Sequence, residues 1–221
     1  MTVRDNRPPY FGEKVCVVLG AMPITAQEAQ DIAGLPHCFL ICADAGLENA
    51  RAYGLTPDLT LGDFDSLAGG EPDIEGEKLT FPVEKDDTDT MLGIKEGLDR
   101  GYRRFLLYGS LGGRLDHTIA NIASLRYLLD HGAHGWLMSE QNCVTMIKDE
   151  SITFLRDDRY PHLSVFSYDQ VARGVTEIGG KYAPAAHELN NVFPLGVSNS
   201  IVGQEATVSV EDGVLLIIRA R

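Results

Sequence analysis

Three short clusters of polar residues in the first half of the sequence have side chains that could carry chemistry. The first is Gly62-Asp63-Phe64-Asp65-Ser66, which begins at the end of the expected strand DLTLGD. Two carboxylates that are two residues apart in an extended segment point the same way and can share one Mg²⁺ ion, which prefers oxygen ligands. A solvated acidic turn uses the same residue types. This spacing alone is therefore compatible with a metal site and with a turn.

The second cluster is Glu84-Lys85-Asp86-Asp87-Thr88-Asp89, just ahead of the segment TDTMLGIKEGLDRG, which we expect to be helical. Asp86 and Asp89 are three residues apart and can share one side of the first helical turn. Acidic residues also favour helix N-termini through the helix dipole. Helix capping would explain one or two acidic residues here, but it explains four acidic residues and a lysine less well. Lys85 could bind a phosphate group. Helix capping and ligand binding are therefore both kept as interpretations of this cluster.

The third cluster, GSLGGRLDH, spans residues 109–117 between an expected strand and an expected helix. Its glycines, Gly112 among them, would let backbone N–H groups approach a phosphate at a helix N-terminus. Arg114 could grip phosphate oxygens in a bidentate manner. Asp116 is equally suited to capping the helix, and His117 is expected to be structural. The segment is not a P-loop, because G-x-x-x-x-G-K-[ST] is absent.

Strand and helix patterns alternate through about residue 140. We expect strands at KVCVVLG, HCFLICAD, DLTLGD, RRFLLYGS and GWLMS, with helices between them. Such alternation predicts a mostly parallel sheet with helices on both faces. Ligands bind outside the carboxyl ends of such strands, so the three clusters should share one rim. In the helix DHTIANIASLRYLLDHG, the apolar residues expected to face the sheet are Ile119, Ile122, Leu125 and Leu129.

After about Gln141 the pattern changes to short β-branched and aromatic runs that are separated by turn residues. This texture predicts a second, all-β domain, a sandwich of short strands. The turn residues Glu211-Asp212-Gly213 predict a hairpin between the last two strands. We therefore assign residues 1–140 to an α/β domain and residues 141–221 to a β-sandwich domain.

The composition excludes several classes of function. The chain has 221 residues, 44% hydrophobic and 23% charged, with a net charge of −13. This acidity argues against a nucleic-acid partner. No apolar run approaches the roughly 20 residues of a membrane span, and the first residues lack the apolar core of a secretory signal. The four cysteines form no C-x-x-C pair and are expected to be buried thiols, which favours a cytoplasmic location.

Taken in order, the motifs resemble those of the thiamine pyrophosphokinase family over nearly the whole chain. The resemblance rests on Ala43-Asp44-Ala45-Gly46, Pro57-Asp58, Gly62-Asp63-Phe64-Asp65-Ser66, Glu84-Lys85-Asp86 with Thr88-Asp89, Gly112-Gly113-Arg114-Leu115-Asp116-His117 with Asn121, Gly174-Val175-Thr176, Gly180-Lys181-Tyr182 and Gly196-Val197-Ser198-Asn199.

This resemblance implies a Rossmann-like catalytic domain, a C-terminal thiamine-binding β-sandwich, and a homodimer whose active sites lie between subunits. It implies Mg²⁺ as cofactor, ATP as co-substrate and thiamine as acceptor. The implied magnesium ligands are Asp63, Asp65 and Asp89. The implied nucleotide and metal shell comprises Asp44, Lys85, Asp86, Thr88, Gly112, Arg114 and Asp116. Ser198 and Asn199 would contact thiamine.

By the same resemblance, the thiamine hydroxyl would attack the β-phosphorus of ATP and AMP would leave, with Asp116 or Asp86 accepting the proton. The sequence departs from the family at two positions: Ala45 stands where glycine is frequent, and Met91 where an acid is. Some members place an aromatic residue in the last strand. Here that strand has none, so Ile217 or a neighbour is expected to form an apolar wall against thiamine.

Other functions are compatible with parts of the pattern. The acceptor could be another alcohol, such as a pterin. The chain could also be a non-catalytic regulator that binds nucleotide or thiamine, or a metal-dependent phosphohydrolase.

Overall fold

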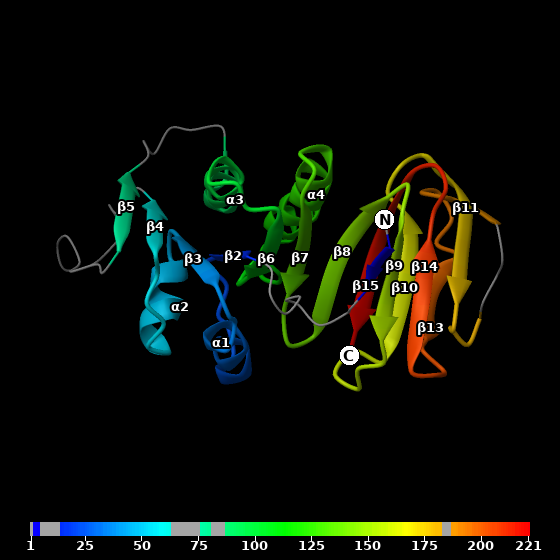
Figure 1. The fold of residues 1–221 in the computed structure, drawn as a ribbon, viewed down its shortest axis with the longest axis horizontal. Helices are drawn as coiled ribbons and strands as arrows, with labels where there is room; N and C mark the ends of the chain where they lie inside the picture. The colour runs from blue at the N-terminus through cyan, green and yellow to red at the C-terminus, as the bar shows by residue number, and fades with distance from the viewer. Residues whose placement is uncertain (1, 5–13, 63–75, 81–86, 183–186) are drawn as a thin grey trace. The chain divides into compact units, whose positions relative to one another are not determined.

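The computed structural model describes residues 2–4, 14–62, 76–80, 87–182 and 187–221. The chain forms two compact units (Figure 1). One unit ends at Ser139. The other begins at Glu140 and also includes the N-terminal strand β1 (Thr2–Arg4), which pairs with β9 of that unit. No helix among the described residues is long and apolar enough to cross a membrane.

The first unit is built on a parallel sheet. Its strands pair in the order β7-β6-β2-β3-β4-β5. They are β2 (Val15–Leu19), β3 (Cys38–Ala43), β4 (Leu59–Gly62), β5 (Glu77–Thr80), β6 (Arg104–Tyr108) and β7 (His134–Met138). The central strands β2 and β4 are buried along their whole length. Continuous apolar burial is expected of a parallel sheet that is covered on both faces, as the sequence predicts.

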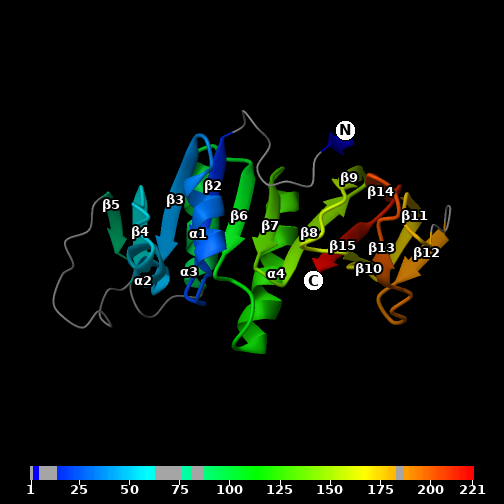
Figure 2. The ribbon, with the colours of Figure 1, turned by 90° about the horizontal axis from the view of Figure 1, so that it is seen from below.

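In the described part of this unit, four helices cover the sheet. They are α1 (Ala26–Ala33), α2 (Gly46–Ala52), α3 (Asp89–Asp99) and α4 (Leu115–Asp130). Helices α1 and α2 lie on one face and α3 and α4 on the other (Figures 1 and 2). Helix α1 begins with a capping box, in which Glu28 N–H donates to Thr25 Oγ1 (3.2 Å) and Thr25 N–H donates to Glu28 Oε2 (2.5 Å).

The face that α4 turns toward the sheet differs from the expected one. The buried residues are Asn121, Ser124, Leu125 and Leu128, whereas Ile119 is 59% exposed. The prediction was right for Leu125 and wrong for Ile119. Two polar side chains belong to the buried face because each has a partner: Asn121 Nδ2 donates to Ser110 O and Ser124 Oγ donates to Asn121 O. The spacing of apolar residues along a helix does not reveal which polar side chains have hydrogen-bond partners in the folded chain.

The second unit contains two sheets, so the prediction of a C-terminal β-sandwich agrees with the structure. One sheet has the order β13-β10-β15-β8 and the other β1-β9-β14-β11-β12. All pairs are antiparallel except β1 with β9. The strands are β8 (Asn142–Lys148), β9 (Ser151–Leu155), β10 (His162–Ser167), β11 (Val171–Ile178), β12 (His187–Asn190), β13 (Gly196–Ser200), β14 (Glu205–Ser209) and β15 (Val214–Ala220).

The predicted hairpin between the last two strands is wrong. Strand β14 pairs with β9 and β11, and β15 pairs with β8 and β10, so the turn at Glu211–Gly213 passes from one sheet to the other. Partners from elsewhere in the chain fix this turn: Gly213 N–H donates to Asp149 Oδ1 (2.8 Å), and Arg173 N–H donates to Asp212 O (2.8 Å). Local turn chemistry does not decide which strands pair.

The apolar core of this unit includes Ile152, Phe154, Val165, Val208 and Ile217. Ile217 is 0% exposed. The expectation that Ile217 forms a wall against a ligand is therefore wrong, because this side chain faces the inside of the sandwich.

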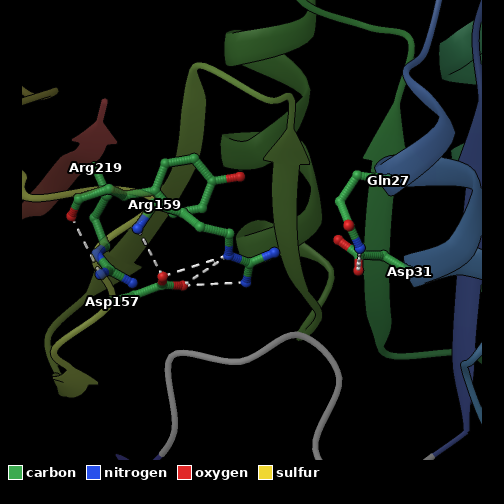
Figure 3. Close-up of polar contacts among 6 residues, drawn as sticks. Gln27, Asp31, Asp157, Arg159 and Arg219 are labelled. Carbon is green, nitrogen blue, oxygen red and sulfur yellow. Dashed lines mark hydrogen bonds and ion pairs between the residues drawn. The ribbon is translucent and has the colours of Figure 1, made fainter.

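Among the described residues of this unit, Arg219 is the most deeply buried charged side chain. Arg219 is 1% exposed, and its guanidinium lies 5.6 Å from the Phe154 ring centroid and 5.7 Å from the Tyr160 ring centroid. Its Nη2 donates to Tyr160 O (3.3 Å), while the neighbouring Asp157 is paired with Arg159 (Figure 3). Burial lowers the pKa of the Arg219 guanidinium. Its Nε and Nη1 atoms make no hydrogen bond within the described structure.

Candidate active site

A pocket of about 340 Å³ lies at the carboxyl ends of the strands of the first unit. It is formed where β2, β3 and β6 end and where α3 and α4 begin. Its lining consists of Gly20, Ala21, Met22, Ala43, Asp44, Thr88, Asp89, Thr90, Gly109, Ser110, Gly112, Arg114, His117 and Asn121. This is the rim where ligands bind in open α/β sheets.

The ends of β2 and β6 meet with their backbones in contact. Gly20 N–H donates to Tyr108 O (2.8 Å) and Met22 N–H donates to Gly109 O (3.0 Å). A Cβ atom on Gly20 would lie 2.7 Å from Gly109 O, and one on Gly109 would lie 2.6 Å from Gly20 O. Only glycine permits this approach at both positions. The segment after β2 was not recognised in the sequence, although a glycine at the end of a central strand could have indicated it.

A side chain of α2 fixes the same segment. Asn49 Nδ2 donates to Gly20 O (3.0 Å) and to Met22 O (2.9 Å). The turn after β2 is therefore held from both sides, by β6 and by α2, which gives the pocket a rigid floor.

The Ala43–Gly46 motif forms the turn from β3 into α2. Asp44 has a left-handed backbone (φ +49°), and its N–H donates to Leu61 O (2.8 Å) at the end of β4. The close approach occurs at Gly46, where a Cβ would lie 1.9 Å from Leu19 O. Ala45 has ordinary helical angles, so alanine is accommodated where the family often has glycine.

The described residues of the second acidic cluster, at the start of α3, have different contacts. Thr88 is the N-cap and accepts a hydrogen bond from Met91 N–H (3.2 Å). Asp87 pairs with Lys95 (2.6 Å). Asp89 belongs to the first turn and lines the pocket. Helix capping thus accounts for Thr88, whereas Asp89 follows the cap and lines the pocket.

The glycine-rich segment before α4 approaches the pocket with left-handed backbone at Gly112 (φ +98°) and Gly113 (φ +63°). Arg114 occupies the N-cap position, so Asp116 is not the cap. Instead Asp116 accepts from Arg114 Nη2 (2.6 Å) and from His117 N–H (3.0 Å). The Arg114 hydrogen bond lowers the pKa of Asp116 to about 2. Arg114 and His117 line the pocket, and Asp116 does not.

Asn121 holds the loop after β6. Its Nδ2 donates to Ser110 O (2.7 Å), and both residues are buried, with 8% and 3% of their surfaces exposed. The glycine-rich segment is therefore anchored to α4 by a side chain in the second turn of the helix.

The structure thus brings five of the predicted site residues to one pocket: Asp44, Thr88, Asp89, Gly112 and Arg114. Four others lie outside the described residues: Asp63, Asp65, Lys85 and Asp86. Among the residues described, no group of three His, Cys, Asp or Glu side chains is arranged to hold a metal ion.

Ser198 and Asn199 belong to β13 of the second unit. Ser198 is exposed and has a left-handed backbone (φ +60°). Asn199 is only 5% exposed, and its side chain is hydrogen-bonded to Glu177 and Tyr182.

The fold and the pocket define a class of protein. A parallel α/β sheet with glycine-rich and acidic segments at the carboxyl ends of its strands is a Rossmann-like unit of the kind that binds nucleotides, here joined to an antiparallel β-sandwich.

The family is shown by two matches to family models. Residues 36–137 match the catalytic domain of thiamin pyrophosphokinase, and residues 149–215 match the vitamin B1 binding domain of thiamin pyrophosphokinase. The chain belongs to the thiamin pyrophosphokinase family, as the order of its motifs predicts.

Individual relatives agree. The chain is 26% identical to a thiamine pyrophosphokinase of Bacillus subtilis (strain 168) in an alignment of length 189, which covers 83% of this chain and 88% of that protein. A crystal structure of thiamine pyrophosphokinase from Bacillus subtilis is similar with a TM-score of 0.84 and 22% identity, covering 94% of this chain and 99% of the other. The crystal structure of thiamin pyrophosphokinase from Geobacillus thermodenitrificans is similar with a TM-score of 0.82 and 24% identity. This similarity covers 94% of this chain and 97% of the other. These structural similarities confirm the predicted fold class.

Proposed function

We propose that this protein is a thiamine pyrophosphokinase, which transfers a pyrophosphoryl group from ATP to the hydroxyl group of thiamine and releases AMP. The observation that carries the proposal is the presence, in order along one chain, of segments matching both the catalytic and the vitamin B1 binding domain. The first unit would then supply catalysis, and the second unit, which includes β1 as well as the C-terminal residues assigned from the sequence, would bind thiamine.

The pocket suits the phosphate groups of a nucleotide. The N-termini of α3 and α4 both open onto it, and helix N-termini favour anions. The Arg114 side chain is 74% exposed in its pair with Asp116. An exposed ion pair contributes little stability, so Arg114 can exchange Asp116 for a phosphate oxygen at small cost.

We propose that Mg²⁺ is held by Asp63, Asp65 and Asp89. The residues described here are compatible with this ion, since two acidic residues, Asp44 and Asp89, line the pocket, and oxygen ligands are those that Mg²⁺ prefers. The end of β4, one residue before Asp63, lies beside Asp44 because Asp44 N–H donates to Leu61 O. Bound there, Mg²⁺ would neutralise charge on the phosphates.

The proton of the thiamine hydroxyl needs an acceptor, and Asp116 and Asp86 are the candidates. While Arg114 is bound to it, Asp116 has a pKa of about 2 and is a weak base. If Arg114 moves to a phosphate, the main cause of that low pKa is removed. Nucleotide binding would then make Asp116 more basic. Asp86 lies outside the described residues.

The proposal extends to assembly and location. We infer a homodimer with active sites between subunits, supported by the family membership, and expect a dimeric mass by light scattering at the concentration used for assays. A fully active monomer would contradict it. The cytoplasm is the proposed location, since the four cysteines are free thiols.

The direct test is to incubate the protein with ATP, Mg²⁺ and thiamine and to identify the products. We expect AMP and thiamine diphosphate in equal amounts, and neither without thiamine or without a divalent metal ion. Stoichiometric ADP would contradict pyrophosphoryl transfer. Phosphate release without an acceptor would indicate a phosphohydrolase, and turnover with a pterin alcohol but not thiamine would indicate another acceptor. Binding without turnover would indicate a regulator.

The metal proposal has its own test. Asp63→Asn, Asp65→Asn and Asp89→Asn should each lower kcat by roughly 100- to 1,000-fold, the effect of losing one charge-stabilising group in a transition state. Asp130→Asn is the matched control, because Asp130 pairs with Arg126 at the far end of α4. Near-wild-type rates for all three site variants at saturating Mg²⁺ would contradict the assignment.

A further inference from the structure

One side chain that lines the pocket has no part in the proposed chemistry. Among the described residues that line the pocket, Met22 carries the largest apolar side chain, since the other apolar ones belong to Ala21 and Ala43. Met22 is half-buried. A thioether carries no charge and is only a weak hydrogen-bond acceptor, so what Met22 contributes to the pocket is packing.

The backbone of Met22 is fixed by its neighbours. Its N–H donates to Gly109 O (3.0 Å), just after β6, and its C=O accepts from Asn49 Nδ2 (2.9 Å) of α2. The next residue is Pro23, and a proline restricts the backbone of the residue before it. The Met22 side chain therefore extends from a point that several parts of the first unit hold in place.

From this point the side chain reaches the glycine-rich segment before α4. A Cβ atom on Gly113 would lie 2.7 Å from Met22 Sδ and 3.0 Å from Met22 Cε, and one on Gly112 would lie 3.9 Å from Met22 Cε. The thioether thus occupies the space where another residue in place of Gly113 would carry its side chain. Glycine adopts many backbone conformations at similar energy, so a pair of glycines needs neighbours to hold one of them.

The glycine-rich segment is thus supported from two directions. Asn121 Nδ2 holds the carbonyl of Ser110 from α4, and Met22 packs against the two glycines from the end of β2. Arg114 follows these glycines directly and is the N-cap of α4. The placement of Arg114 at the pocket therefore depends on both supports.

We propose that Met22 is a positioning residue for the phosphates of the donor. Its thioether packs against Gly112 and Gly113 and keeps the glycine-rich segment in the conformation that receives phosphate oxygens. This inference rests on the proposed function in one respect, that the pocket binds a nucleotide. A segment that is already ordered loses less conformational entropy on binding. Met22 therefore raises the affinity for ATP through the glycines and without contacting the nucleotide base.

The test is calorimetric binding to the full chain with Mg²⁺ in excess and without thiamine. The two probes are ATP and inorganic tripolyphosphate, which has a chain of three phosphates but no ribose and no base. Met22→Ala should raise the dissociation constants of both probes by the same factor, roughly 3- to 30-fold. The ATP KM should rise similarly, whereas kcat at saturating ATP should stay within about twofold of wild type, because the bound nucleotide orders the segment again.

Two variants serve as controls. Met22→Leu keeps most of the side-chain volume, so both dissociation constants should stay within about threefold of wild type, since volume-conserving exchanges are tolerated best. Met138→Ala removes a methionine side chain from β7 of the same unit, and Met138 is 4% exposed and does not line the pocket. We expect Met138→Ala to unfold at lower urea concentration and to bind both probes as the wild type does.

Several results would overturn the inference. If Met22→Ala weakens binding of ATP but not of tripolyphosphate, Met22 contacts the ribose or the base and does not act through the glycines. Unchanged binding of both probes would show that the segment needs no support from Met22. A wild type that does not bind tripolyphosphate would show that the segment does not receive phosphates. Equal losses in Met22→Ala and Met22→Leu, or in Met22→Ala and Met138→Ala, would exclude packing at this position as the cause.

Failure of the proposed function gives a different result. A wild-type protein that binds ATP but forms no thiamine diphosphate would refute the function. The binding measurements on Met22→Ala contain no thiamine and no turnover, so they would still decide whether Met22 positions the glycine-rich segment.

Discussion

The anchoring of the glycine-rich segment by Asn121 makes a quantitative prediction. In Asn121→Ala, the carbonyl of Ser110 loses the Nδ2 donor that lies 2.7 Å away. Ser110 is 3% exposed, so water does not readily replace that donor. The change removes few atoms from the core, and its main effect should be one unsatisfied buried acceptor beside the pocket.

The expected cost follows from this geometry. A buried acceptor left without its partner costs about 1–3 kcal/mol. Alanine is a better helix former than asparagine by up to about 0.7 kcal/mol, which offsets part of the loss. We therefore expect the free energy of unfolding to fall by roughly 1–2 kcal/mol. If the displaced segment binds nucleotide phosphates, 1.4 kcal/mol of that cost would appear as a roughly tenfold rise in ATP KM.

The assay combines urea unfolding with steady-state kinetics. Ser124→Ala is the matched control, because Ser124 Oγ is also buried and donates to Asn121 O (2.6 Å) but does not contact the pocket segment. We expect it to lose some stability and to keep the ATP KM of the wild type. Thiamine KM should change in neither variant.

Two results would refute this reasoning. An unchanged free energy of unfolding in Asn121→Ala would mean that the buried carbonyl finds another donor. An ATP KM that rises equally in Asn121→Ala and Ser124→Ala would mean that general loosening of α4, and not the loss of the Ser110 contact, impairs nucleotide binding.

Three other predictions concern stability and reactivity. Burial raises the pKa of the Cys38 and Cys42 thiols to about 12, so at pH 8 the folded protein should react slowly with Ellman's reagent, and a fast native thiol would contradict this. Gly46→Ala should abolish soluble folding, because its Cβ would lie 1.9 Å from a carbonyl oxygen of β2, whereas Gly203→Ala, with no atom within 4 Å, should express normally. Arg219→Met should leave the free energy of unfolding in urea unchanged or raise it by about 1–4 kcal/mol, since a buried charge with unpaired N–H groups is removed. A clear drop in this free energy would show that the contacts of Arg219 with the Phe154 and Tyr160 rings dominate.

Much of the fold could be predicted because its signals are local. The strands of the first unit are apolar runs, and the Thr25 and Glu28 side chains that cap α1 are three residues apart in the sequence. Parallel strands separated by helices place their carboxyl ends on one rim, so the pattern predicted that Asp89 and Arg114 would meet. Asp44, which lines the same pocket, was assigned to the site by the family resemblance.

Pairings between distant segments could not be predicted in this way. The turn before β15 has hairpin residues, yet β14 and β15 lie in different sheets, because contacts with Asp149 and Arg173 direct the chain. The exposure of Ile119 also depends on the partners of Asn121 and Ser124, which only the folded chain supplies.

For Asn199, too, the sequence predicted one part of the answer and the tertiary structure decided the other. The family resemblance of its motif predicts that Asn199 contacts thiamine. Only the tertiary structure reveals that Glu177 and Tyr182 consume its hydrogen bonds and that the exposed group beside it is the Tyr182 ring. A sequence specifies which polar atoms a residue carries, but whether those atoms face a ligand or another part of the chain is decided when distant segments pack and buried groups must find partners.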